Sequence, residues 1–315
     1  MQLLSVIIPM YNEEEVIAES YRRLHAAVEP IDMGYELIFI NDGSRDKTYS
    51  IMSEIQKQDP HVKLISFSKN FGHQLAVTAG LDYASGDAIV IIDADLQDPP
   101  ELIPEMIRMW REGAEVVYGK RSSRKGETFF KKFTAFAFYR TLRSLAGYDI
   151  PADTGDFRLI DRKVADVMRN MREHNRFLRG MVPWTGFKQV PLEYARDERW
   201  AGTTKYTMKK MLNLALNGIL AFSDKPFTLM GGLGIGMMGI AGIWLVVLLV
   251  LLCVGMPAPI QAVCAFCLLL TGILVLCMSI LGLYLTRVYD EVKGRPLYIV
   301  SEAVGFDTAP ESSKA

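Results

Sequence analysis

The chain has 315 residues, of which 35 are Lys or Arg and 36 are Asp or Glu, so its formal net charge at pH 7 is -1. This composition excludes a disordered chain and a disulfide scaffold, and the balanced charge excludes general nucleic-acid binding, which needs a basic surplus. The charges are unevenly placed, because no Asp, Glu, Lys or Arg occurs in residues 226–286. We therefore expect a globular domain joined to a membrane anchor, with no nucleic acid among its partners.

The N-terminal part of the chain alternates short apolar runs with longer amphipathic stretches. Such an alternation predicts an α/β fold, with a mostly parallel sheet covered by helices on both faces. The predicted strands are residues 4–9, 36–41, 62–67, 88–93 and 115–118, and two of the predicted helices are residues 14–28 and 47–58. Because ligands bind such sheets beyond the carboxyl ends of the strands, the residues at those ends indicate the chemistry.

Acidic and amide side chains follow three of the predicted strands, in residues 9–13, 41–44 and 93–98. In extended chain, residues two apart face the same side, so Asp93 and Asp95 point together and Gln97 can join them. Two clustered carboxylates repel each other unless a cation lies between them, and oxygen ligands favour Mg²⁺ or Mn²⁺. We therefore predict a metal site at Asp93, Asp95 and Gln97.

Other acids near these strand ends have a plainer explanation as helix caps. Asp98 precedes Pro99, Pro100 and Glu101, an order typical of a helix N-terminus with Pro at its first position. We expect Asp98 to cap that helix and to have a structural role.

Two stretches later in the chain combine apolar and basic residues. Residues 128–145 carry five Phe among Lys and Arg, and residues 205–220 are similar but less aromatic. Amphipathic helices of this kind suit the headgroup boundary of a membrane. The alternative, which the sequence leaves open, is burial of the aromatic side chains within the protein.

The uncharged run near the C-terminus is long enough for two membrane helices, since about 20 apolar residues cross a bilayer core. Residues 255–259, Gly-Met-Pro-Ala-Pro, break the run and separate predicted spans at 227–254 and 260–285. Lys and Arg flank both outer ends and are missing from the turn, so the positive-inside rule places both termini and the large domain in the cytosol. A helical hairpin buried in a soluble core is the alternative, but such helices rarely stay uncharged on every face.

Several motifs resemble those of glycosyltransferase family 2 enzymes, which have the glycosyltransferase-A fold. They are SVIIPMYNE (5–13), NDGSRDKT (41–48), SKNFG (68–72), DADLQDPPE (93–101), TGDFRL (154–159) and GTTKY (202–206). Within the family, the chain resembles the polyprenyl-phosphate glycosyltransferases, which include dolichol-phosphate mannosyltransferase-like enzymes. The two-helix anchor followed by GRPLY (294–298) is similar to that of the bacterial bactoprenol glucosyltransferases.

The resemblance implies a division of the chain into four parts. Residues 1–202 would form the cytosolic glycosyltransferase-A catalytic domain, and residues 203–226 an interfacial amphipathic helix and acceptor loop. Residues 227–286 would form the two transmembrane helices, and residues 287–315 a cytosolic tail. The implied location is the bacterial inner membrane.

The resemblance also implies roles for single residues. The residues expected to bind the nucleotide-sugar are Pro9, Tyr11, Glu13, Asp42, Asp93 and Asp95. Asp93, Asp95 and Gln97 would hold Mg²⁺ or Mn²⁺ on its diphosphate. Arg121 would face phosphate, and Lys205 and Arg199 would receive the phosphate of the lipid acceptor.

The implied catalytic residues are Asp156, Asp95 and Arg121. Asp156 is similar to the residue often given the role of base in the family. A phosphate monoester has its second pKa near 6, so the acceptor is already mostly dianionic at neutral pH. We therefore expect Asp156 to orient the acceptor or the sugar hydroxyls.

The implied reaction is the metal-dependent, inverting transfer of a hexose from a nucleotide-sugar to a polyprenyl (undecaprenyl) phosphate. UDP-glucose is the first candidate donor, while other UDP or GDP sugars and a homo-oligomeric state stay open. One rival is a processive polysaccharide synthase, because RDERW (196–200) resembles the (Q/R)-x-x-R-W motif of those enzymes. The other rival is a membrane protein that senses nucleotide-sugar without catalysis.

Overall fold

The computed structural model describes residues 2–123, 154–195, 225–254 and 260–306. In chain order the elements are β1 (Leu3–Met10), α1 (Ile17–Val28), β2 (Gly34–Asn41), α2 (Thr48–Gln58), β3 (Val62–Phe67), α3 (His73–Tyr83), β4 (Ala88–Ile91), the short 3-10 helix η1 (Pro100–Leu102), α4 (Ile103–Arg111), β5 (Val116–Ser123), β6 (Thr154–Asp161), α6 (Arg162–Asn170), α7 (Leu178–Trp184), β7 (Gln189–Ala195), α9 (Lys225–Cys253), α10 (Ile260–Val292) and β8 (Val300–Val304). All five predicted strands and both predicted helices are therefore present.

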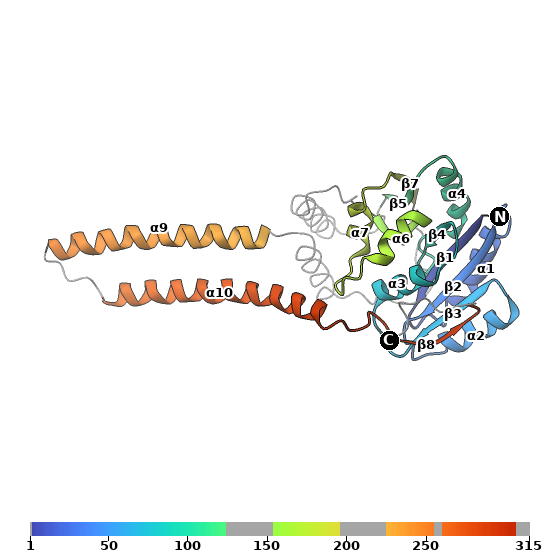
Figure 1. Cartoon of the computed structure of the whole chain (residues 1–315), viewed down its shortest axis with the longest axis horizontal. Helices are drawn as coiled ribbons and strands as arrows, with labels where there is room; N and C mark the ends of the chain where they lie inside the picture. The colour runs from blue at the N-terminus through green and yellow to red at the C-terminus, as the bar shows by residue number, and fades with distance from the viewer. Residues whose placement is uncertain (1, 124–153, 196–224, 255–259, 307–315) are drawn as a thin grey trace.

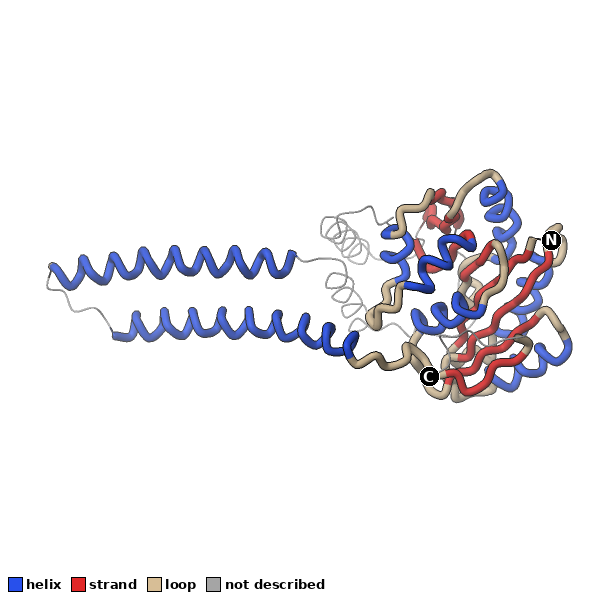
Figure 2. The backbone as a smooth tube through the Cα atoms, viewed as in Figure 1, coloured by secondary structure: helices blue, strands red, loops and turns tan. Residues whose placement is uncertain are grey.

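The described strands form one sheet, in the order β7-β5-β6-β4-β1-β2-β3-β8. Figure 2 shows these strands in red. β1 pairs in parallel with β2 and β4, β2 pairs in parallel with β3, and β5 does so with β7. β6 lies antiparallel between β4 and β5, and β8 lies antiparallel on β3. The sheet is therefore mostly parallel, as predicted, with two reversed strands that the sequence analysis does not predict.

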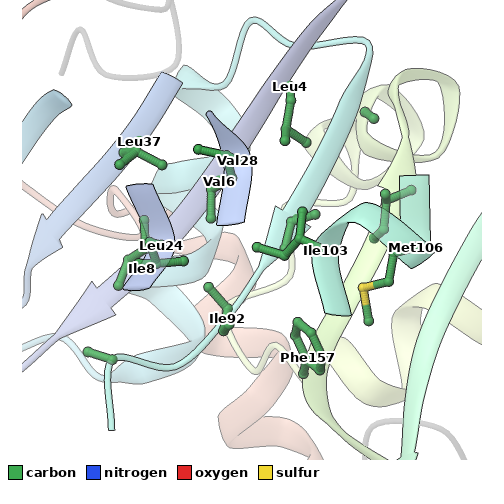
Figure 3. Close-up of a cluster of buried hydrophobic side chains, with 14 of the residues drawn as sticks. Leu4, Val6, Ile8, Leu24, Val28, Leu37, Ile92, Ile103, Met106 and Phe157 are labelled. Atoms are coloured by element: carbon green, nitrogen blue, oxygen red, sulfur yellow. The ribbon is translucent and has the colours of Figure 1, made fainter. Parts of the chain in front are cut away.

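Helices cover both faces of the sheet, so the central strands are buried on both sides. Val6 and Ile8 of β1 belong to a core shared with α1 and α4 (Figure 3), whereas Ile7 belongs to a second core shared with α3 and α6. Buried parallel strands read as continuous apolar runs, which explains why these strands are visible in the sequence. α3 lies so close to β1 that a Cβ atom at Gly80 would be 2.3 Å from Ile7 Cγ2.

The residues after α10 return to the sheet. Within the predicted cytosolic tail at residues 287–315, β8 pairs with β3, and the Tyr298 ring stacks on Phe67 with 5.2 Å between centroids. Antiparallel pairing of β8 covers the edge that β3 would otherwise expose. Part of the predicted tail therefore packs back onto the sheet, and the domain boundary at residue 287 stays a prediction.

α9 and α10 extend together away from the sheet (Figure 1), and the Trp244 and Phe266 rings stack between them at 5.7 Å. Within the described residues, Leu269–Val292 is long and apolar enough to cross a membrane, with a mean hydropathy of 2.2, and a shorter apolar stretch covers Gly234–Trp244. The part of the chain that the structure describes therefore contains one candidate span, and the second span stays a prediction. The turn at 255–259 and the amphipathic stretches 128–145 and 205–220 lie outside the described residues.

Candidate active site

The carboxyl ends of β1 and β2 are fastened to each other by hydrogen bonds. The Asn12 amide N–H donates to Ser44 Oγ at 3.0 Å, and Asn12 Oδ1 accepts from the Arg45 amide at 2.9 Å. Asn12 has φ +53, a left-handed conformation that Asn tolerates better than most residues. The Glu13 amide donates to Thr48 Oγ1 at 2.8 Å. This loop carries Tyr11 and Glu13, two residues predicted to bind the nucleotide-sugar, and both are half-buried.

Pro9 is buried within β1, opposite Ile40 of β2. Pro9 is therefore part of the sheet, and only Met10, the last residue of β1, separates it from the loop that carries Tyr11 and Glu13. Contact between Pro9 and a nucleoside stays a prediction.

Asp42, which directly follows β2, organises the loop that leads into α3. Its buried carboxylate accepts hydrogen bonds from the Phe71 amide at 2.7 Å, the Gly72 amide at 3.0 Å and Asn70 Nδ2 at 2.9 Å. Burial raises the pKa of Asp42, against the opposing effect of the backbone donors. The approach of this loop requires Gly43, where a Cβ atom would lie 2.4 Å from the Lys69 carbonyl carbon. Asp42 therefore sets the position of residues 70–72, and its predicted contact with a nucleoside stays a prediction.

The acidic motif after β4 forms a turn. β4 ends at Ile91, two residues earlier than predicted, so the alternation of an extended chain does not align Asp93 with Asp95. Instead, the backbone N–H of Gln97 donates to Asp95 Oδ1 at 3.2 Å. The residue between them, Leu96, is buried and has φ +58. A left-handed Leu is rare, and such strain clusters at functional sites. The side chains of Asp93, Asp95 and Gln97 are all half-buried on this turn.

Asp156 lies at the start of β6 between two cationic side chains. Arg179, in the first turn of α7, donates from Nε to Asp156 Oδ1 at 2.9 Å and from Nη2 to Oδ2 at 3.0 Å. His73, the first residue of α3, places Nε2 3.2 Å from Asp156 Oδ2 and 3.6 Å from Asp93 Oδ1. His73 therefore links the acidic turn after β4 to Asp156.

These contacts shift the pKa values of the three linked groups. Burial opposes ionisation of Asp156, but Arg179 and His73 hold its pKa well below the usual range. Burial also lowers the pKa of His73, and the neighbouring Asp93 and Asp156 outweigh it and raise that pKa to about 9. The pKa of Asp93 rises to about 6, because burial and nearby carboxylates outweigh the attraction of His73. Asp156 is therefore a paired anion, unsuited to accept a proton.

His73 and Arg179 are site residues that the sequence analysis does not identify. His73 directly follows the SKNFG motif, so its place beside a motif is a usable signal. Arg179 lies in no quoted motif, and only the packing of α7 beside β6 brings it to Asp156.

Arg121 projects from β5 beside Asp98 and Tyr194. Tyr194 donates its hydroxyl hydrogen to Asp98 Oδ1, and Arg121 Nη2 lies 3.9 Å from the same oxygen. Asp98 is therefore not a helix cap, contrary to expectation: it is buried, and the N-cap position of η1 belongs to Pro99. A Cβ atom at Gly155 would lie 2.6 Å from Arg121 Nη2, which places Arg121 against the strand that carries Asp156. Lys205 and Arg199 lie outside the described residues.

Comparison with known proteins identifies the family. Residues 5–169 match the family described as glycosyl transferase family 2. The chain belongs to this family. It is 52% identical over 305 residues to the uncharacterized glycosyltransferase YkcC of Bacillus subtilis (strain 168), covering 96% of this chain and 94% of that protein.

This glycosyltransferase is also similar to bactoprenol glucosyl transferases. It is 39% identical to the prophage bactoprenol glucosyl transferase homolog of Escherichia coli (strain K12), over 94% of this chain and 98% of that protein. It is 38% identical to the bactoprenol glucosyl transferase of Shigella phage SfII, over 95% and 98%. These relatives place the enzyme in the polyprenyl-phosphate branch of the family, and it is a hexosyltransferase with the glycosyltransferase-A fold.

Among solved structures, the glycosyltransferase is similar to a mannosyltransferase from Pyrobaculum calidifontis in complex with GDP-Man and Mn²⁺. The identity is 18%, the match covers 60% of this chain and 54% of that one, and the TM-score is 0.45.

The glycosyltransferase has the ligand types for a hard divalent cation. Its described residues contain no cluster of three or more His, Cys, Asp or Glu side chains arranged to hold a metal ion. Mg²⁺ is often bound by only one or two carboxylates together with substrate phosphates, so a complete protein cage is not needed. The half-buried carboxylates of Asp93 and Asp95 and the amide oxygen of Gln97 fit that requirement.

Proposed function

We propose that the enzyme transfers a hexose from a nucleotide-sugar to a polyprenyl phosphate, giving a polyprenyl-phosphate sugar at the cytosolic face of a membrane. The observation that carries this proposal is the extent of the match to bactoprenol glucosyl transferases. That match covers 95% of this chain and 98% of the Shigella phage SfII protein, so it includes α9 and α10 as well as the catalytic domain. UDP-glucose is the proposed donor, since the relatives are named for glucosyl transfer.

The reaction exchanges one bond to the anomeric carbon of the sugar. An oxygen of the acceptor phosphate forms the new bond, and the bond to the nucleoside diphosphate breaks, with its electron pair leaving on the diphosphate. Attack from the far face inverts the anomeric centre. The acceptor phosphate is mostly dianionic at neutral pH, so no protein group must remove a proton. This chemistry agrees with the ion-paired state of Asp156, whose two oxygens both accept from Arg179.

The acidic turn after β4 has a separate part in this proposal. Asp93, Asp95 and Gln97 would hold Mg²⁺ or Mn²⁺, which offsets the charge that builds on the leaving diphosphate. Tyr11, Glu13 and Asp42 lie around the ends of β1 and β2, and we assign the nucleoside to that side of the site. Arg121 projects beside Asp98 and is assigned to phosphate, as are Lys205 and Arg199.

The proposed location is the bacterial inner membrane, with the catalytic domain and both termini in the cytosol. The apolar helix Leu269–Val292, with no part of its most apolar window buried, supports a membrane anchor. The uncharged residues 226–286 support a second span in α9. An acceptor with a long isoprenoid chain would lie in the same membrane as this anchor.

The test is transfer of radioactive sugar into organic-extractable lipid. Membranes containing the protein receive undecaprenyl phosphate and one labelled nucleotide-sugar at a time, with and without EDTA. We expect EDTA-sensitive labelling of lipid from UDP-glucose, and loss of that labelling in Asp95→Asn. The exposed Asp32→Asn, in the loop before β2, is the matched control and keeps wild-type activity.

Other outcomes of this test favour other functions. Label in a water-soluble polymer indicates a processive polysaccharide synthase. Nucleotide-sugar binding without transfer from any donor indicates a sensor. If EDTA does not reduce labelling of the lipid, the proposed metal dependence is contradicted, but the proposed transfer reaction is not.

A further inference from the structure

Asp156 forms a two-bond ion pair with Arg179 in the described part of the site. Asp156 accepts two hydrogen bonds from Arg179, at 2.9 and 3.0 Å, and lies 3.2 Å from His73 Nε2. Bidentate arginine–carboxylate pairs fix the plane and direction of the guanidinium group. Asp156 therefore holds Arg179 in one orientation.

The relative exposure of this pair shows which charge an incoming ligand meets. The Asp156 side chain is 6% exposed, whereas the side chains of Arg179 and His73 are 27% and 31% exposed. The Asp156 carboxylate therefore lies beneath the surface, whereas the Arg179 and His73 side chains are partly exposed, with His73 Nε2 itself buried. An anion that reaches this surface meets the positively charged Arg179 side chain.

The group that contacts a predicted metal ligand in this cluster is His73. His73 Nε2 lies 3.6 Å from Asp93 Oδ1 and 3.2 Å from Asp156 Oδ2, and Arg179 pairs with the same Asp156 carboxylate. A displacement with inversion needs the attacking group on the face of the sugar opposite the leaving diphosphate. A phosphate bound by Arg179 would therefore be held by a group other than the carboxylates assigned to the diphosphate.

The segment that leads into α7, and so to Arg179, contacts the end of the candidate membrane helix. His174, five residues earlier, donates its amide hydrogen to Glu291 Oε1 at 2.8 Å, and its ring Nδ1 lies 2.9 Å from Glu291 Oε2. Glu291 belongs to the last turn of α10, so these bonds fasten the segment before α7 to that end of the helix. A lipid acceptor anchored by its isoprenoid chain would present its phosphate from this direction.

We propose that Arg179, oriented by Asp156 and flanked by His73, binds the phosphate of the lipid acceptor. This inference rests on the proposed function and adds to it a residue outside every quoted motif. Asp156 is then a positioning residue for Arg179. Its carboxylate stays ionised through the reaction and exchanges no proton with either substrate.

The experiment compares Arg179→Gln with a matched variant elsewhere in the domain. Arg172 Nη1 donates to both oxygens of Asp82 at 2.9 Å, and the two side chains are 34% and 3% exposed, which resembles the Arg179–Asp156 pair in burial. Arg172→Gln therefore removes a comparable ion pair outside the site. Initial rates are measured while undecaprenyl phosphate and UDP-glucose are varied separately.

We expect Arg179→Gln to raise the KM for undecaprenyl phosphate by about tenfold or more, the size typical of a lost charge-assisted hydrogen bond. The KM for UDP-glucose stays at the wild-type value, and Arg172→Gln changes neither. Arg179→Lys, which keeps the charge, recovers part of the acceptor affinity. An equal rise in both KM values, or no change in the acceptor KM, would overturn the proposal.

A binding measurement keeps this inference separate from the proposed reaction. Calorimetry of the full-length wild-type protein with geranyl phosphate, geraniol and inorganic phosphate distinguishes the headgroup from the tail. We expect geranyl phosphate to bind the wild type and Arg172→Gln with equal affinity, and to bind Arg179→Gln at least about tenfold more weakly. The affinity for geraniol, which has no phosphate, should be the same for all three proteins. Binding of inorganic phosphate that depends on Arg179 supports a site for the phosphate itself. If no nucleotide-sugar supports transfer, the binding of geranyl phosphate still decides the role of Arg179. Equal affinity of Arg179→Gln and Arg172→Gln for geranyl phosphate would refute that role.

Discussion

Asp156 shows how the surroundings of an acid decide its chemical role. A general base must be able to accept a proton near the operating pH. Both Asp156 oxygens accept from Arg179, and His73 lies 3.2 Å away, so the pKa of Asp156 is well below that range. The same contacts make Asp156 a support for two donor groups. Its importance for activity therefore has a geometric origin.

The variant Asp156→Asn tests this role through the separation of catalysis from donor binding. Asn keeps the shape of the side chain but loses the charge that fixes Arg179, and a misplacement of about 1 Å in a reacting complex can cost roughly 100-fold in rate. We expect kcat to fall by about that factor. Binding of UDP, measured by calorimetry with Mn²⁺, stays unchanged.

The control for this variant is Asp82→Asn, which removes the carboxylate of the Arg172 pair. It tests whether loss of any buried ion pair reduces activity. Equal losses of catalysis and UDP binding in Asp156→Asn contradict the positioning role of Asp156.

At the scale of elements, a buried carboxylate joins β1, β2 and β3 at the end of the sheet opposite the site. Glu36 of β2 is 3% exposed and lies 2.6 Å from Lys63 Nζ of β3. Its Oε1 also accepts from Ser5 of β1 and, at 2.7 Å, from the Ser85 amide. Burial disfavours the charged form, but Lys63, Ser5 and Ser85 together lower the pKa of Glu36.

We expect Glu36→Gln to lower the free energy of unfolding at pH 7 by about 3 kcal/mol, because breaking a buried pair leaves an uncompensated charge. The lowered pKa means that the ionised Glu36 stabilises the fold above its unfolded pKa of about 4.3. That stabilisation is lost as the pH falls through the folded pKa. The difference between wild type and variant, measured by unfolding in detergent, therefore shrinks below about pH 4.

The exposed Glu54→Gln of α2 is the control, and its unfolding stays at the wild-type value at every pH. A Glu36→Gln difference that grows as the pH falls would contradict the assigned ion pair.

The predictability of each element follows from its burial and from the distance of its partners in the chain. β1 to β5 carry apolar runs because the central strands are covered on both faces. β6 contains Asp156, Arg158 and Asp161, which hide its strand character, and β8 is short and pairs with β3 from a distant part of the chain. No local pattern contains that pairing.

The residues of the site also differ in how far the sequence predicts them. Asp93, Asp95 and Gln97 lie in one motif at one strand end, so their type and spacing predict a shared role. The contact of His73 with Asp156, and that of Arg179 with Asp156, join residues from α3, β6 and α7. Those contacts depend on tertiary packing, which periodicity and composition do not encode. The same packing replaced the expected cap at Asp98 with a buried contact to Tyr194.

At the scale of the whole molecule, the catalytic domain is fastened to the end of α10 by several contacts. His174 Nε2 lies 2.9 Å from the Arg295 carbonyl oxygen, in addition to its bonds with Glu291. Tyr298 donates to Asp82 Oδ2 at 2.7 Å, and β8 then pairs with β3. α10 ends at Val292, so Arg295 and Tyr298 follow it closely in the chain. If α10 crosses a membrane as proposed, the domain must lie on the same side as the C-terminal end of α10.

This attachment and the flanking charges together predict the topology of the protein. Lys209, Arg287 and Lys293 lie outside the uncharged run and none lies in the turn at 255–259, so the positive-inside rule places the domain in the cytosol and the turn outside it. The test replaces the native cysteines with alanine at Cys253, Cys264, Cys267 and Cys277. Single cysteines are then introduced as Met256→Cys in the turn and Lys57→Cys on α2.

We expect a membrane-impermeant maleimide to label Met256→Cys in intact spheroplasts, and to label Lys57→Cys only after the membrane is opened. Transfer activity of each variant shows that the replacements leave the fold intact. The reverse labelling pattern would place the catalytic domain outside the cell, where nucleotide-sugars are not supplied. Protection of both positions in intact spheroplasts would mean that the turn does not cross, leaving α10 without a partner span. Labelling of Met256→Cys alone therefore establishes two spans, because the turn and the domain that His174 fastens to α10 must then lie on opposite sides.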